Sequence, residues 1–140
     1  MIAFDADVLS DIWAGHPELS RRAAEIPVHE QVVPVVVVEE MLRGRLNSIR
    51  QAEAGKSKLS IERAYELLEQ TLDAFKQVIV LSYSSQAQEL FESWRRQKVN
   101  VGTHDLRIAA ICVSHGTKLI TRNQRDFARI PGLDFEIWNC

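Results

Sequence analysis

Acidic side chains occur at three distant places in the sequence, and each lies beside an apolar run that is typical of a buried element. Asp5 and Asp7 follow the apolar residues 1–4. Glu40 follows a run of valines, and Asp105 opens an apolar stretch. A carboxylate at the end of a buried element is costly to desolvate, so several that converge usually share a cation. Ligand sets made only of oxygen suit magnesium or manganese, and the pattern therefore indicates a divalent metal site.

Each of these carboxylates has a simpler interpretation when it is taken alone. An aspartate at a helix start is more often a cap or a partner of the helix dipole than a ligand, and this applies to Asp7 and Asp105. Glu40 would then be an ordinary first-turn glutamate. The metal hypothesis depends on three separate segments delivering a carboxylate to one edge of the fold.

Composition indicates an ordinary globular protein. The chain has 140 residues, of which 46% are hydrophobic and 26% charged, so we expect one domain that spans residues 1–140. The formal net charge of -2 argues against a protein that binds nucleic acid through bulk positive charge. Any contact with nucleic acid must then depend on local arginine and lysine clusters or on a metal ion.

The two cysteines, Cys112 and Cys140, do not form a short-spaced pair of the zinc or redox kind. We expect Cys112 to be a small core residue. Asp5 and Asp7 interrupt the first apolar stretch too early for a signal peptide, and no apolar run reaches the roughly 18 residues of a membrane span. The sequence therefore predicts a cytoplasmic protein with no membrane segment.

Short apolar runs alternate with longer segments of helical period, which is the pattern of an α/β fold with a parallel sheet flanked by helices. Predicted strands lie at residues 2–4, within 32–37, at 78–81, at 118–121 and near 135–138. Predicted helices lie at residues 8–13, 18–24, 39–52, 57–75, 85–97 and 105–115, and Gly116 is well placed to end the last one.

Function in open parallel sheets gathers at the carboxyl ends of the strands, beside the point where the strand order reverses. Polar residues follow three of the predicted strands there: Asp5 and Asp7, then Glu40, then Asn123 and Asp126. Asp105 lies at a predicted helix start, and a helix amino terminus can face the same cleft.

Four segments resemble, in order, the motifs of PIN-domain ribonucleases, and especially of the VapC toxins of bacterial toxin-antitoxin pairs. Residues 5–10, DADVLS, are similar to the opening Asp-Thr-Asn-Val-Leu of that family. Residues 37–44, VVEEMLRG, are similar to the second motif, in which a glutamate lies four residues before a glycine, so Glu40 is the matching acid. Residues 102–110, GTHDLRIAA, resemble the third motif, and residues 119–127, LITRNQRDF, resemble the fourth.

The resemblance implies a PIN-like three-layer domain with a central parallel sheet flanked by helices, one or two Mg2+ or Mn2+ ions, and hydrolysis of phosphodiester bonds in RNA. Asp5, Glu40 and Asp105 would be the catalytic, metal-coordinating acids. A metal held there would supply both the activated water and the Lewis acid, so that no protein base is needed. His104, beside Asp105, is the sole histidine candidate for a base, and a surface role is its simpler interpretation.

The sequence departs from the family pattern at two places. The fourth motif places Asn123 where an acid is usual, so Asn123 could bind metal only through its carbonyl or through water. Asp126, three residues later, could substitute for it or could order the loop. Asp7 stands where the family usually has asparagine and adds negative charge beside Asp5, so it is a further candidate ligand.

Substrate contacts are expected near the second and fourth motifs, because arginine forks match phosphate oxygens. The candidates are Arg43 and Arg122, with Arg45, Arg50 and Arg125 beside them, and Thr121, whose hydroxyl could instead orient water or a carboxylate or simply pack in the core. Trp13, Trp94 and Trp138 could stack bases, although packing is their simpler role.

The expected partners are an RNA substrate, a cognate antitoxin whose tail covers the acidic cleft, and a second copy of the chain. The homodimer prediction depends on the apolar stripe of residues 57–75, which exceeds what one sheet face needs. Two alternatives remain open. The chain could be a catalytically weakened PIN-like module that binds RNA or protein, a hypothesis favoured by Asn123, or another magnesium-dependent phosphatase or nuclease, since a fold does not fix a substrate.

Overall fold

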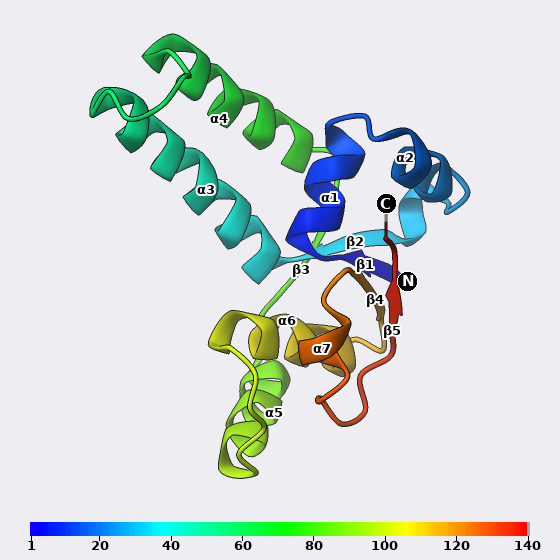
Figure 1. Ribbon diagram of the computed structural model, residues 1–140. Helices are drawn as coiled ribbons and strands as arrows, with labels where there is room; N and C mark the ends of the chain where they lie inside the picture. Colours follow the sequence, from blue (N-terminus) through cyan, green and yellow to red (C-terminus); the bar gives the residue numbers. More distant parts are fainter. Residues whose placement is uncertain (140) are drawn as a thin grey trace. The chain divides into compact units, whose positions relative to one another are not determined.

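A sheet of five parallel strands forms the centre of the fold in the computed structural model, which describes residues 1–139 (Figure 1). The strands are β1 (Ile2–Phe4), β2 (Gln31–Pro34), β3 (Ile79–Leu81), β4 (Lys118–Thr121) and β5 (Phe135–Ile137). Their spatial order is β3-β2-β1-β4-β5. The order reverses at β1, so the switch point lies between β1 and β4, where the carboxyl ends of two neighbouring strands diverge. Cys140 lies outside the described residues.

The chain forms two compact units, of which the first contains the whole sheet. This sheet unit consists of Met1–Val37 and the chain from Ile79 onward. In Figure 1, α1 and α2 lie on one side of its strands, and α5 and α6 lie on the other, as right-handed crossovers in opposite directions require. Its helices are α1 (Ala6–Trp13), α2 (Pro17–Ala24), α5 (Ser85–Arg96), α6 (Thr103–Ser114) and α7 (Gln124–Phe127), with a 3-10 turn at Val28–Glu30. The predicted three-layer α/β fold is confirmed.

The second unit, Val38–Val78, is a pair of helices. It contains most of α3 (Val35–Glu53) and all of α4 (Ile61–Phe75). Inside this hairpin unit, Arg45 donates a hydrogen bond to the Thr71 hydroxyl at 2.9 Å, and Thr71 donates to the Leu67 carbonyl at 2.9 Å. Among residues 1–139, no helix is both long enough and apolar enough to cross a membrane.

The core lies on both faces of the sheet, which explains why its strands read as unbroken apolar runs instead of alternating ones. Consecutive residues of β4, Leu119 and Ile120, are both fully buried. Helix α6 buries an unbroken run from Ile108 to Cys112. Cys112 is a free, buried thiol, so its predicted core role is confirmed.

The run of four valines folds differently from the prediction. Strand β2 ends at Pro34, and Val35 begins α3, so the prediction that Glu40 directly follows a strand was wrong. Glu40 lies in the second turn of the helix, which begins well before the predicted residue 39. Valine has a modest helix propensity, but Val36 and Val37 are buried, and tertiary packing outweighs that preference.

Other helix starts also differ from the prediction. Helix α4 begins at Ile61 and not at residue 57, since the Ser60 hydroxyl accepts a hydrogen bond from the Arg63 amide at 3.1 Å. Helix α6 begins at Thr103 after Gly102, so Asp105 lies in its first turn instead of opening it. The short helix α7 and the 3-10 turn were not predicted, because neither is long enough to show a period.

Glycines 116 and 44 provide a matched test of the helix boundaries. Gly116 has φ of +63° at the end of α6, whereas Gly44 is inside α3, and an added Cβ meets nothing within 4 Å at either place. Gly116→Ala should therefore lower the free energy of unfolding by about 1–2 kcal/mol through backbone strain alone. Gly44→Ala should raise it by about 0.5–1 kcal/mol. Urea unfolding followed by circular dichroism measures both, and shifts of the same sign would contradict the assigned boundaries.

Candidate functional site

Asp5 follows β1, and hydrogen bonds hold both its backbone and its carboxylate. Its backbone amide donates to the Ile120 carbonyl at 2.9 Å, which extends the pairing of β1 with β4 by one residue. One carboxylate oxygen, Oδ1, accepts from the Ala6 amide at 2.8 Å and so caps α1. The other, Oδ2, accepts from the Thr121 hydroxyl at 2.7 Å. Burial raises the pKa of Asp5, and these hydrogen bonds oppose the rise.

Asp105 approaches the same edge of the sheet unit from the first turn of α6. Its pKa is raised to about 6, first by burial and then by the negative charges of Asp5 and Asp126. The side chain of His104 opposes this rise. Carboxylates from three separate segments are therefore close enough for their charges to interact.

Asn123 links two of these carboxylates through its side-chain amide. Its Nδ2 donates to Asp126 Oδ2 at 2.9 Å and lies 3.3 Å from Asp105 Oδ2, to which it also donates. Its Oδ1 accepts from the Asp126 amide at 3.3 Å and caps α7. The backbone amide of Asn123 donates to the Thr121 hydroxyl oxygen at 3.1 Å. The side-chain nitrogen Nδ2 of Asn123, and not its carbonyl oxygen, therefore faces the carboxylates in this arrangement.

The other predicted ligands have different positions. Asp7 is exposed in the first turn of α1, and its charge contributes to the raised pKa of Asp5. Glu40 lies on α3 in the hairpin unit, partly exposed. The convergence of Glu40 with Asp5 and Asp105 stays a prediction.

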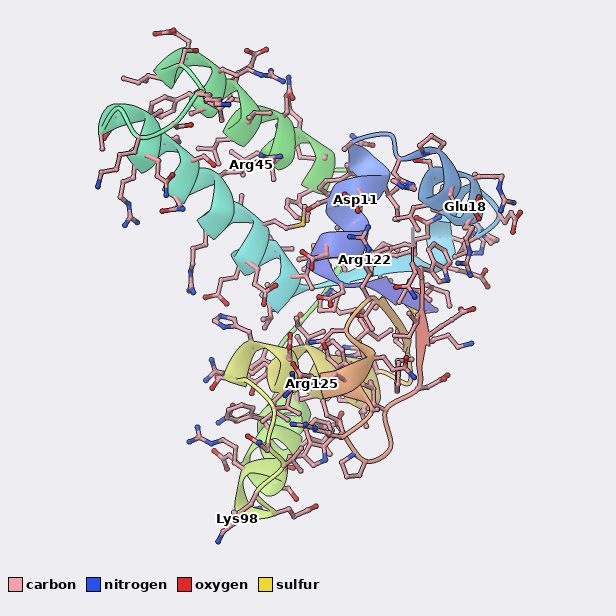
Figure 2. All side chains as sticks on the ribbon, in the orientation of Figure 1. Asp11, Glu18, Arg45, Lys98, Arg122 and Arg125 are labelled. Atoms are coloured by element: carbon pink, nitrogen blue, oxygen red, sulfur yellow. The ribbon has the colours of Figure 1, made fainter. Side chains whose placement is uncertain are left out.

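The predicted substrate arginines already make contacts within the protein. Arg43 donates to Glu39 at 2.7 Å in an exposed pair one helical turn apart. Arg122, just after β4, is paired with Asp11 on α1, and Figure 2 shows the two labelled side chains beside each other. Arg125 is exposed on α7. Their contacts with RNA stay predictions.

Asp11 and Trp138 contribute to the site in roles that the sequence did not predict. Asp11 is one of several acids on exposed helix faces, and its pairing with a residue 111 positions away could not be read from spacing. Trp138 donates its backbone amide to the Thr121 carbonyl at 3.0 Å and so fixes the end of β4 from the other side. Trp138 and Trp94 are both buried, and Trp138 packs edge-on against Phe4, which supports packing over base stacking for both.

The donor set fits a hard divalent cation in its chemistry. Asp5, Asp105 and Asp126 offer only oxygen, and burial together with repulsion raises the pKa of Asp5 and Asp105, which a cation would reverse. Within residues 1–139, however, no three His, Cys, Asp or Glu side chains are already arranged as a metal site. Asn123 Nδ2 donates to one oxygen of each of two acids, Asp105 and Asp126, so it competes with a cation for those oxygens.

Comparison with known proteins identifies the class. The PIN domain family model matches residues 2–133, so the chain belongs to the PIN domain family. A segment of 39 residues, 28% of this chain, is 49% identical to Ribonuclease VapC1 of Rickettsia felis. A segment of 46 residues is 33% identical to Ribonuclease VapC of Rickettsia bellii. These matches span only 29% and 34% of the length of those two relatives.

Solved structures extend the likeness of fold over the whole chain. The DNA-bound VapBC from Salmonella typhimurium has a TM-score of 0.75 with 24% identity, covering 99% of this chain and 98% of that one. The VapBC2 from Rickettsia felis, bound to a promoter DNA fragment, has a TM-score of 0.73 with 23% identity over 99% and 100% of the two chains. At these identities the comparison establishes the fold.

The raised pKa of Asp105 predicts how the stability of the metal-free protein depends on pH. Because the folded-state pKa of about 6 exceeds the ordinary 3.8, the folded protein binds the proton more tightly, and stability falls as pH rises from about 4 through 6. Asp105→Asn should therefore raise the Tm near pH 7, and the gain should shrink toward pH 4. Differential scanning fluorimetry measures this.

Asp134→Asn is the matched control, because Asp134 is exposed and lies outside the cluster. It should change the Tm little at any pH. A gain for Asp105→Asn that is equal at both ends of the pH range would show that charge repulsion is not its cause.

Proposed function

We propose that this chain is a metal-dependent endoribonuclease that hydrolyses RNA phosphodiester bonds as the toxin of a toxin-antitoxin pair. The observation that carries the proposal is the gathering of Asp5, Asp105 and Asp126 at the switch point of a PIN-family sheet. The two relatives named as ribonucleases support the reaction. RNA in the cytoplasm is the substrate, and the whole chain acts as one PIN domain.

Asp5, Glu40 and Asp105 are the proposed metal-binding and catalytic acids, with Asp126, Asp7 and Asn123 as further candidates. A bound Mg2+, or Mn2+, would supply Lewis acidity and an activated water. Thr121 orients Asp5 by donating to one of its oxygens. Asn123 keeps Asp105 and Asp126 at hydrogen-bonding distance from one side chain. The protein therefore supplies preorganised oxygen donors, which is what phosphoryl chemistry with a hard cation needs.

Arg125 and Arg43 are the proposed phosphate contacts. Arg125 is exposed on α7, beside Asp126 of the acidic cluster. Arg43 is exposed on α3, three residues after Glu40, and its ion pair with Glu39 is of the exposed kind that contributes little stability. A phosphate can therefore replace Glu39 as the partner of Arg43 at small cost.

An antitoxin is the proposed protein partner. The structures of similar fold include a toxin-antitoxin complex from Klebsiella pneumoniae, with a TM-score of 0.63. In this chain, the negative charge around Asp5 and Asp105 suits a cationic segment as well as a metal ion. A basic tail that covers the cluster would therefore exclude metal and substrate together.

A homodimer is proposed through α4. Its exposed apolar residues Ile61, Tyr65 and Leu72 have exposed fractions of 43%, 47% and 45%, and their spacing places them along one side of the helix. A hollow of about 530 Å³ lies beside Leu72 and Phe75 on the same helix. An apolar stripe of this kind is typical of an interface, and most homo-oligomers are symmetric dimers.

A catalytically weakened binding module is the second candidate, and Asn123 is the observation that favours it. An amide that already bridges Asp105 and Asp126 can replace the cation as a structural element. RNA binding without metal-dependent cleavage would support this candidate over the first.

Asp5→Asn tests the catalytic assignment. The substitution keeps the shape and removes one charge from the proposed metal site, so cleavage of an RNA panel in Mg2+ or Mn2+ should fall by at least about 100-fold. Circular dichroism should show an unchanged fold, and the metal-free Tm should rise because repulsion with Asp105 is relieved. Asp134→Asn should keep full activity, and full activity of Asp5→Asn would exclude Asp5 as a ligand.

Tyr65→Glu tests the dimer. Placing a charge in the apolar stripe should convert a dimer into a monomer in sedimentation velocity at micromolar concentration, with secondary structure retained. Glu66→Gln, on the adjacent exposed position of the same helix, is the control and should leave the dimer intact. A monomeric wild-type chain at high micromolar concentration would contradict the proposal.

A further inference from the structure

Side chains join two segments that meet at the proposed metal site, the end of β4 with its loop and α1 with its N-cap, at two separate points. At the first, the Thr121 hydroxyl at the end of β4 donates to the Asp5 carboxylate at the end of β1. At the second, the Arg122 guanidinium is paired with the Asp11 carboxylate on α1. Adjacent residues of β4 and its loop therefore hold both the start and the interior of one helix.

Asp5 and Asp11 belong to the same rigid element. Asp5 is the N-cap of α1, and Asp11 lies six residues further along the helix, which is about 9 Å along the helix axis. Val8 and Leu9 of α1 are buried, so core packing already limits the position of this helix. The Arg122–Asp11 contact, one to two turns from the cap, further restricts how the helix can tilt and rotate, and with it the direction of the Asp5 side chain.

Arg122 also lies next in sequence to Asn123, which contacts the other two carboxylates of the site. It lies between Thr121, which is fully buried, and Asn123, whose amide holds Asp105 and Asp126. The side chains of Arg122 and Asp11 have exposed fractions of 30% and 36%, so water only partly screens their attraction. The planar guanidinium of Arg122, which contacts Asp11 through Nη2, is also more restrictive in direction than a lysine ammonium would be.

The same pairing weakens the case for Arg122 as a phosphate ligand. A guanidinium that binds a carboxylate can bind RNA phosphate only if it leaves that partner, and a half-buried Asp11 would then keep an uncompensated charge. Arg125, exposed on α7, has no such constraint from the acidic cluster. The two arginines of this loop therefore have different roles.

We propose that the Arg122–Asp11 pair is a positioning device that locks α1 to the β4–α7 loop, and thereby holds the Asp5 carboxylate in the direction that a metal ion requires. The proposal rests on the proposed metal-dependent function. In this proposal Arg122 positions the residues of the site, and Arg125 contacts the substrate.

A double-mutant cycle with Asp11→Asn and Arg122→Gln tests the pair. Each single variant should weaken Mn2+ affinity in calorimetric titration by about 10-fold, as loss of a residue that orients a ligand does. The double variant should be no weaker than the weaker single variant, because both changes remove one interaction. The KM for RNA at saturating Mn2+ should stay unchanged in all three variants. Arg125→Gln is the matched control and should raise the KM without changing Mn2+ affinity.

Asp11→Asn distinguishes the two roles of Arg122. If Arg122 instead binds phosphate, Asp11→Asn should leave the Mn2+ affinity unchanged, and Arg122→Gln should raise the KM for RNA. This result would overturn the positioning role of Arg122 and leave the proposed nuclease function standing. A wild-type protein that neither binds Mn2+ nor cleaves RNA would overturn both proposals. If Arg122→Gln fails to fold, Arg122→Lys replaces it in the cycle, and retention of normal Mn2+ affinity by Asp11→Asn overturns the proposal on its own.

Discussion

The constraint on which the rest of the structure depends is the mutual repulsion of carboxylates that the fold gathers at one sheet edge. Burial raises the pKa of both Asp5 and Asp105, and the negative charges of Asp5 and Asp126 raise the pKa of Asp105 further. Isolated charges in such a place would destabilise the fold, so each acid is tied to a donor. Thr121, Asn123 and the start of α1 supply these donors, and the local architecture can be understood as the means of holding like charges together.

Strand order explains why the charges meet at this place. The sheet extends from β1 in both directions, so the strand order reverses there and the switch point lies between β1 and β4. The segments after these two strands carry Asp5 and Asn123, and α6 begins beside them. Helix packing then places Asp105 without any strand of its own. The strand order therefore determines which segments meet at the site, and the side chains on those segments determine its chemistry.

The sequence was sufficient for the sheet, for most helices and for the family, because period and motif order are local signals. It was insufficient at Val35–Val38, where the choice between strand and helix depended on burial that only the folded chain defines. It also missed the partnership of Asp11 with Arg122, since spacing says nothing about which charges meet across 111 residues. Composition and motifs identified the acids, whereas the hydrogen bonds that orient them required the structure.

The side-chain amide of Asn123 has a consequence for the stability of the ion-free protein. By donating to Asp105 and Asp126, the neutral side chain of Asn123 forms hydrogen bonds to two carboxylates where an aspartate would have added a further charge. The ion-free arrangement is therefore stabilised by one side-chain amide, which competes with a cation for the same two carboxylate oxygens.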